Sequence, residues 1–173
     1  VKQSGVSIFV IVILFFLSSL FGFFYSSELS FIDIYIREII AKTANLDLLS
    51  LFIYILQNNI QSAFVPMVLG VFFGILPIFG SMVNGVVLGY VFSKVYALSG
   101  FSEYWRILPH GIFELPAIFI ALAIGLRLGG LWFFSSKKKR IDLLYLSCIT
   151  FLLLVIPLLI IAAVIETLAL FLI

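Results

Sequence analysis

Long apolar stretches constrain this chain more than any other feature of its sequence. The first covers about residues 6–24 and contains no charged side chain. A helix of about 20 apolar residues crosses the roughly 30 Å hydrocarbon core of a bilayer. Apolar residues make up 64% of the 173 positions and charged residues 10%, whereas a soluble domain has about 45–50% and about 25%. A soluble fold could not bury so much hydrocarbon, so we predict an integral membrane protein with a single transmembrane domain, 1–173.

Four further apolar segments follow the first, at about 46–76, 81–98, 107–128 and 141–173. We therefore predict an all-α fold, a polytopic transmembrane helix bundle of about five spans. The second and fifth segments are too long for one straight span. The second is expected to kink or change depth at Pro66 and to end in a turn at 77–80. The fifth is expected to tilt, to kink at Pro157 or to extend beyond the bilayer.

The segment between the first two spans is polar and periodic. It carries Glu28, Asp33, Arg37, Glu38 and Lys42, and its isoleucines recur near helical spacing. This pattern predicts an amphipathic helix at about 28–45 that lies in the interface, in contact with membrane lipids, or caps the bundle.

Orientation follows from lysine and arginine, which are enriched in cytoplasmic loops. The one basic run, Lys137 to Arg140, precedes the fifth span. With five spans, this run and the amino terminus lie on the same side, so both are predicted to be cytoplasmic in a multi-pass protein of the cell membrane. The amphipathic segment and the loop at 100–106 are then expected outside.

Ionisable side chains inside the spans are candidate functional residues, because each costs roughly 2.5–3.5 kcal/mol to insert. His110, the only histidine, and Glu114 share a helix face at i and i+4. At a rise of about 1.5 Å per residue, Glu114 lies roughly 10 Å below the start of its segment and Lys94 roughly 20 Å above the start of its own. In a core of about 30 Å these depths coincide, and Glu166 is expected at a similar level. We therefore predict a polar intramembrane cluster of His110, Glu114, Glu166 and Lys94. The alternatives are a Glu114 carboxylate satisfied by backbone N–H groups or by Lys94, and a His110 that bonds a loop carbonyl.

Small residues recur every four positions in the third span, at Ser81, Gly85, Gly89 and Ser93. Such a stripe allows a neighbouring helix to approach closely, and Asn84 is a polar residue beside it. The second span contains Gln57, Asn58 and Asn59, followed by Gly70 and Gly74 as a small-xxx-small pair. Amides in hydrocarbon need partners, so we expect these three to bond across helix interfaces rather than to bind a substrate.

Catalytic and ligand-binding signatures are missing from the sequence. One histidine and scattered carboxylates do not form a metal motif, and there is neither a Gly-x-Ser-x-Gly motif nor a phosphate-binding glycine loop. The net charge of +2, without a basic patch, does not indicate nucleic acid. We therefore predict no catalytic residues, no cofactor, no metal and no nucleic-acid partner: the protein is not an enzyme.

Several of these motifs together resemble a known family. They are Gln57-Asn58-Asn59, Gly70 with Gly74, Asn84-Gly85 with Gly89, the run LPHGIFELP at 108–116 and AAVIE at 162–166. From about 56 to 166 the chain resembles the stage II sporulation protein M family of integral membrane proteins. The resemblance implies an all-helical membrane protein without known catalytic activity. The member in spore-forming bacteria is similar to a membrane anchor that holds cell-wall-degrading partners during engulfment, and relatives occur in bacteria and archaea that do not sporulate.

Two functional hypotheses follow. The first is a membrane scaffold or anchor for partner proteins, as a homo-oligomer or with a membrane-protein partner. The alternative is a small-solute or ion transporter or channel that uses His110, Glu114 and Glu166. A continuous polar cavity would favour transport, whereas a dry bundle with an exposed apolar or amphipathic face would favour scaffolding.

Overall fold

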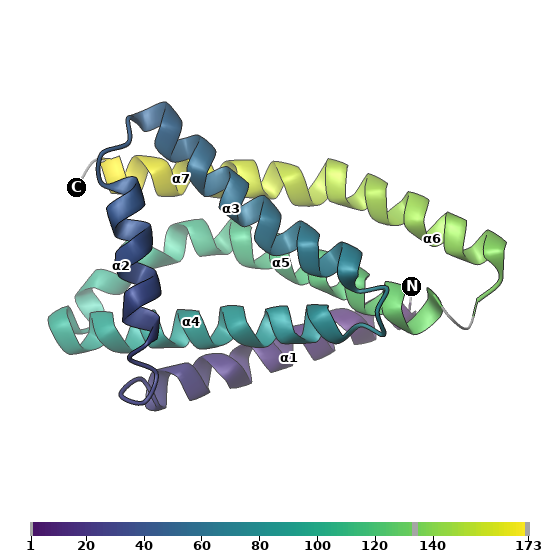
Figure 1. The fold of residues 1–173 in the computed structure, drawn as a ribbon, viewed down its shortest axis with the longest axis horizontal. Coiled ribbons are helices and arrows are strands. Elements are labelled where there is room, and N and C mark those ends of the chain that lie inside the picture. Colours follow the sequence, from purple (N-terminus) through teal and green to yellow (C-terminus); the bar gives the residue numbers. More distant parts are fainter. Residues whose placement is uncertain (1, 133–134, 172–173) are drawn as a thin grey trace.

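The computed structural model describes residues 2–132 and 135–171, without the side chains of 2–4, 102, 103, 105–110, 131 and 132. The described chain is helical apart from short connections, which confirms the all-α prediction (Figure 1). In chain order the elements are α1 (Lys2–Phe24), α2 (Ile32–Thr43), α3 (Leu48–Leu69), α4 (Ile75–Ser99), the 3₁₀ turn η1 (Gly100–Glu103), α5 (Tyr104–Trp132), α6 (Lys137–Thr150), the π-helical segment η2 (Phe151–Val155) and α7 (Ile156–Phe171).

Five stretches of helix in the described chain are long and apolar enough to cross a membrane: Gly5–Phe24, Leu48–Leu69, Ile75–Ser99, Gly111–Gly130 and Lys137–Phe171. The last combines α6, η2 and α7 into one continuous helix. The amphipathic helix α2 is shorter, 12 residues, and lies across one end of the bundle, at a steep angle to the spans (Figure 1). These findings confirm the prediction of about five spans with one additional amphipathic helix.

The turn between the second and third spans lies earlier than predicted. We expected it at 77–80, but α3 ends at Leu69, the connection covers 70–74, and α4 begins at Ile75. Phe73 and Gly74 have positive φ angles of 57° and 71°, a conformation that glycine adopts at little cost. Pro77 lies in the first turn of α4, where a backbone N–H has no partner within the helix, so proline is tolerated there.

The fifth span passes Pro157 through a π-helical segment. The Ile156 N–H bonds the carbonyl of Phe151, five residues earlier, immediately before the proline that cannot donate a backbone hydrogen bond. The helix therefore continues through η2 to Phe171, with a local change of winding in place of a break.

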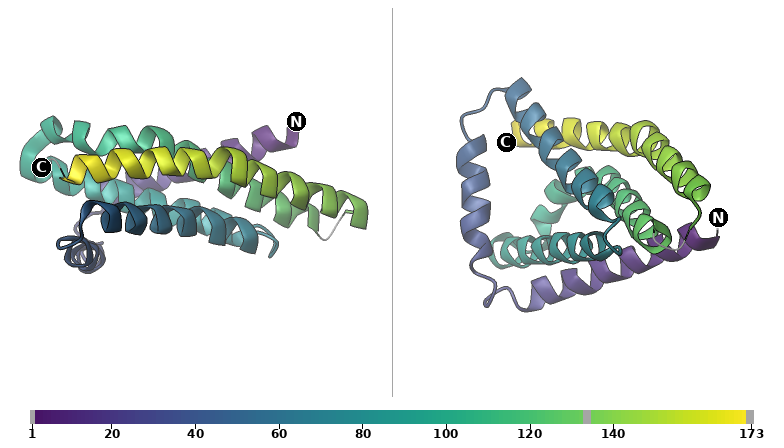
Figure 2. Two further views of the ribbon diagram at one scale, coloured as in Figure 1. Left: turned by 90° about the horizontal axis from the view of Figure 1, so that it is seen from above. Right: turned by 45° about the vertical axis from the view of Figure 1, so that its right-hand side comes forward.

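Helix α1 packs closely along α4, as Figures 1 and 2 show. A Cβ atom added at Gly85 would overlap the backbone of Phe15, and one at Gly89 would overlap the backbone of Ser19. The Ser81 hydroxyl donates a 2.8 Å hydrogen bond to the Ile11 carbonyl, so the stripe of small residues lies against α1 along its length.

A second close contact joins α3 to α5. A Cβ at Gly70 would overlap the backbone of Gly125, and one at Gly129 would lie 2.5 Å from the Gly70 carbonyl oxygen. Further along, Ala63 of α3 packs with Ala117 of α5 and Leu159 of α7 in the main apolar core. From their shared turn α3 and α4 diverge, and α2 lies across the wide end of the V they form (Figure 2).

Candidate functional site

Helix α5 places Glu114 in the wall of a pocket between α1, α4 and α5. The pocket has a volume of about 500 Å³, and Asn84 and Glu114 are the polar members of a lining that is otherwise apolar or glycine. Asn84 donates a 2.8 Å hydrogen bond to the carbonyl of Gly80 in its own helix. The pocket wall is therefore mainly hydrocarbon, and Glu114 is the one ionisable residue in its lining.

Glu114 also lies near Glu166 of α7. Both side chains are partly buried, and they are close enough for their charges to interact. Two negative charges in apolar surroundings repel one another strongly, so a proton or another cation at this pair would stabilise the bundle. Across the described residues, no group of three or more histidine, cysteine, aspartate or glutamate side chains is arranged to hold a metal ion.

Lys94 pairs with a residue outside the predicted cluster. Its ammonium group lies 3.6 Å from a carboxylate oxygen of Asp33 in α2 and 5.0 Å from the centre of the Tyr90 ring. The pKa of Asp33 lies below its usual value because the Tyr90 hydroxyl and, to a smaller extent, Lys94 stabilise the charged carboxylate. The contacts among Asp33, Tyr90 and Lys94 hold the start of α2 against α4.

The helix register explains why Lys94 lies apart from Glu114. The close contact of Gly125 with Pro77 indicates the antiparallel alignment of α4 and α5. Counting from that contact, Glu114 is level with Leu88, six residues before Lys94. At about 1.5 Å per residue, Lys94 lies roughly 9 Å nearer the end of the bundle. We predicted one level for the two side chains because we expected the helices to begin at 81 and 107, whereas they begin at Ile75 and Tyr104.

The predicted cluster is thus divided in the structure. Glu114 and Glu166 are near enough for their charges to interact, and Lys94 pairs with Asp33. His110 is in α5, one turn before Glu114, but its side chain is outside the described part of the chain. The sequence contained a signal for the group around Lys94, since Tyr90 and Lys94 share a face of α4 at i and i+4. It gave no indication that α2 would dock on that face.

The three predicted amides face in different directions. Asn59 is buried, with 4% of its surface exposed, and its Nδ2 has no hydrogen-bond partner among the described residues. It belongs to the buried face of α3, which consists of Leu51, Ile55, Asn59, Ala63 and Met67. Gln57 and Asn58 are exposed, and so is Gln61 one turn later. Because successive residues point about 100° apart on a helix, these consecutive amides could not share one interface.

Two comparisons with known proteins found similar sequences. The family model described as Stage II sporulation protein M matches residues 11–169. An uncharacterized protein of Methanocaldococcus jannaschii, MJ0706, is 32% identical over 130 residues, which cover 72% of this chain and 58% of that protein. The chain thus spans less than two thirds of this relative's length. No solved structure matches the chain.

Proposed function

The chain belongs to the stage II sporulation protein M family, and on that premise we propose that this multi-pass membrane protein is a non-enzymatic scaffold that holds a partner protein at the membrane surface. The observation that carries the proposal is the position and exposure of α2. This helix crosses the outside of the bundle near one end (Figure 1), where its Asp33 pairs with Lys94 of α4.

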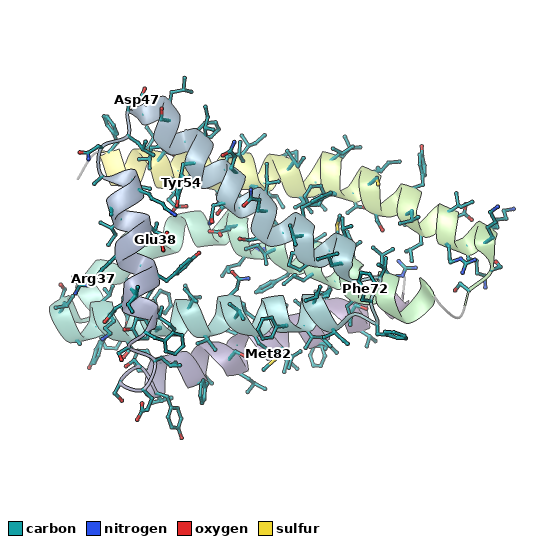
Figure 3. All side chains as sticks on the ribbon, viewed as in Figure 1. Arg37, Glu38, Asp47, Tyr54, Phe72 and Met82 are labelled. Atoms are coloured by element: carbon teal, nitrogen blue, oxygen red, sulfur yellow. The ribbon has the colours of Figure 1, made fainter. Side chains whose placement is uncertain are left out.

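Helix α2 offers a mixed surface to a partner. Ile34 is 72% exposed and Tyr35 52% exposed, and Arg37 and Glu38 lie on the exposed side of the same helix (Figure 3). Glu38 pairs with Lys42 at 2.7 Å along the helix. An exposed apolar patch rimmed by polar residues marks a site of interaction with a protein or a membrane. We propose that the extramembrane part of a partner binds this surface.

The interior of the bundle supports a scaffold better than a channel or transporter. Glycine contacts bring α1 against α4 and α3 against α5 with no space for a side chain between them. The Glu114 pocket is lined mainly by apolar groups, and a second pocket of about 330 Å³, between α1, α5 and α6, is also mostly apolar. A hydrated path for ions would need polar groups along its length.

Photocrosslinking in native membranes tests this proposal. A photoreactive amino acid replaces Ile34 or Arg37 of α2, and the control replaces Leu153, which is 74% exposed on the fifth span. We expect discrete protein adducts from the α2 positions and lipid adducts from Leu153. If the α2 positions also gave only lipid adducts, α2 would be an interfacial anchor and the scaffold proposal would fail.

One observation favours the alternative of transport. Glu114 lines a pocket and its charge interacts with that of Glu166 on another span, an arrangement that a proton or small cation could use. Purified protein in vesicles, compared with the Glu114→Gln variant, tests this function. Ion or proton flux that the variant abolishes in correctly folded protein would favour transport over scaffolding.

A further inference from the structure

The outward side of α3 carries amide groups at the middle of a membrane span. Gln57 and Gln61 are exposed, as are Ile53, Phe64 and Val68, at 44%, 44% and 42%. We call these five residues the amide face. They lie on the side of α3 opposite the residues that pack against α5 and α7.

The surroundings of this face cannot satisfy its polar groups. Gln57 and Gln61 lie near the centre of the span Leu48–Leu69, where hydrocarbon offers no hydrogen-bond partner. Their amides are directed away from the rest of the bundle. A buried polar group without a partner is costly, and in membrane proteins such amides bond to another helix. A further helix that covered this face would supply these partners.

We propose that the amide face of α3 docks against the same face of a second copy of the chain. Each glutamine amide has both donors and an acceptor, so it is complementary to itself. None of the five residues is charged, so two copies meet without repulsion between like charges. All copies cross the membrane in the same direction, so a two-fold axis along the membrane normal brings equal depths together.

This symmetry specifies the contacts. The two α3 helices run parallel, and Gln57 and Gln61 meet the corresponding glutamines of the second copy at mid-membrane depth. Ile53 lies one turn before them and Phe64 and Val68 one to two turns after them, so apolar side chains close the interface above and below the amides. Helices with side chains of this size pack at about 8–10 Å between axes. The interface is built from α3 residues, so this proposal does not rest on the function proposed for α2.

Disulfide crosslinking of purified protein in lipid vesicles tests the interface. Single cysteines replace Gln57, Gln61 or Phe64 in a Cys148→Ser background, and Leu17→Cys is the control, because Leu17 is 59% exposed on α1. A parallel two-fold interface predicts dimers linked through the same residue at all three α3 positions, at least tenfold more than for Leu17→Cys. Equal crosslinking at all four positions would overturn the proposal.

Counting subunits by single-molecule photobleaching in vesicles gives a second measurement. The wild-type protein should bleach in two steps. The double variant Gln57→Leu, Gln61→Leu should bleach in one step while it keeps the wild-type melting temperature, because leucine is stable against lipid. If the wild-type protein is a monomer, and in native membranes a photocrosslinker at Gln57 captures another protein, the second copy is the wrong occupant, although the scaffold proposal for α2 would stand.

Discussion

The contact between α1 and α4 gives the sharpest prediction of stability. At Gly89, an added Cβ would lie 2.7 Å from the carbonyl carbon of Ser19 and 2.9 Å from the backbone nitrogen of Phe23. The Ser19 carbonyl oxygen would lie closer still, and ordinary carbon contacts need about 3.5 Å, so even alanine must move the helices apart by more than about 0.8 Å. The obstructing atoms belong to the backbone and cannot rotate away.

This displacement has a calculable cost. A gap of about 0.5–1 Å removes roughly a quarter to a half of the dispersion energy across a contact. It would also stretch the 2.8 Å hydrogen bond between Ser26 and Ser93 at the end of the same interface. Inserting a methyl group into a packed interface costs about 1–3 kcal/mol. For a protein of this size, each kcal/mol lowers the melting temperature by about 2–4 °C.

Thermal unfolding in detergent provides the assay. We expect Gly85→Ala and Gly89→Ala each to lower the melting temperature by about 2–12 °C, and leucine at either position to lower it further. The control is Gly130→Ala, where a Cβ meets no described atom within 4 Å. That variant should melt at or slightly above the wild-type temperature, because alanine is a better helix former than glycine. If all three alanine variants had the same melting temperature, α1 and α4 would not be in the contact described.

Three further predictions follow. For topology, membrane-impermeant thiol reagents should label a cysteine near Phe101 from outside and one near Lys138 only after the cytoplasmic side is opened; the opposite pattern would reverse the assigned orientation. For pH, a lowered pKa in the folded protein means that the contribution of Asp33 to docking α2 is present at neutral pH and is lost as the pH falls through that value, below the usual 3.8. The distance between spin labels on α2 and α4 should therefore be constant from about pH 7 to 5 and increase in stronger acid. The Asp33→Asn variant should show the longer distance already at neutral pH. If neither acid nor the substitution changed the distance, Asp33 would not have this role. For the carboxyl pair, Glu114→Gln keeps hydrogen-bonding groups and removes repulsion from Glu166, so it should melt at or above the wild-type temperature and Glu114→Ala below it; identical melting of the two variants would refute a structural role for the pair.

The spans and the small-residue stripe could be predicted because each rests on a local rule. Twenty apolar residues must cross the bilayer, and small side chains one helical turn apart must form a smooth face. Which helix packs against that face depends on the tertiary structure. Helix α1 meets the stripe with Gly22, where an added Cβ would overlap the backbone of Val86. A lone glycine in an apolar helix does not reveal this pairing by itself.

The turn between α3 and α4 and the polar intramembrane cluster were harder to predict, because each prediction depended on an ambiguous sequence pattern. Gly70 and Gly74 have the spacing of a packing motif, and they do contact α5, but Gly74 also forms the turn through its positive φ. Once the start of α4 is assigned six residues late, the depth of Lys94 is misjudged. The pairing of Lys94 with Asp33 further requires the docking of α2, which short-range periodicity does not encode.

The π-helical segment sets the rotational phase of the last span. From α6 to α7, buried positions recur every four residues, at Leu143, Ser147, Phe151, Val155, Leu159, Ala163 and Thr167. Four residues of α-helix turn about 400°, so such a repeat drifts by about 40° at each step. The additional residue in the wide turn of η2 sets this drift back by roughly 100°. The part of the drift that remains accompanies a change of neighbours, from α5 beside α6 to α3 and α5 beside α7. The segment thus acts as a phase correction, and without it the Glu166 carboxylate would be rotated by about a quarter of a turn away from Glu114.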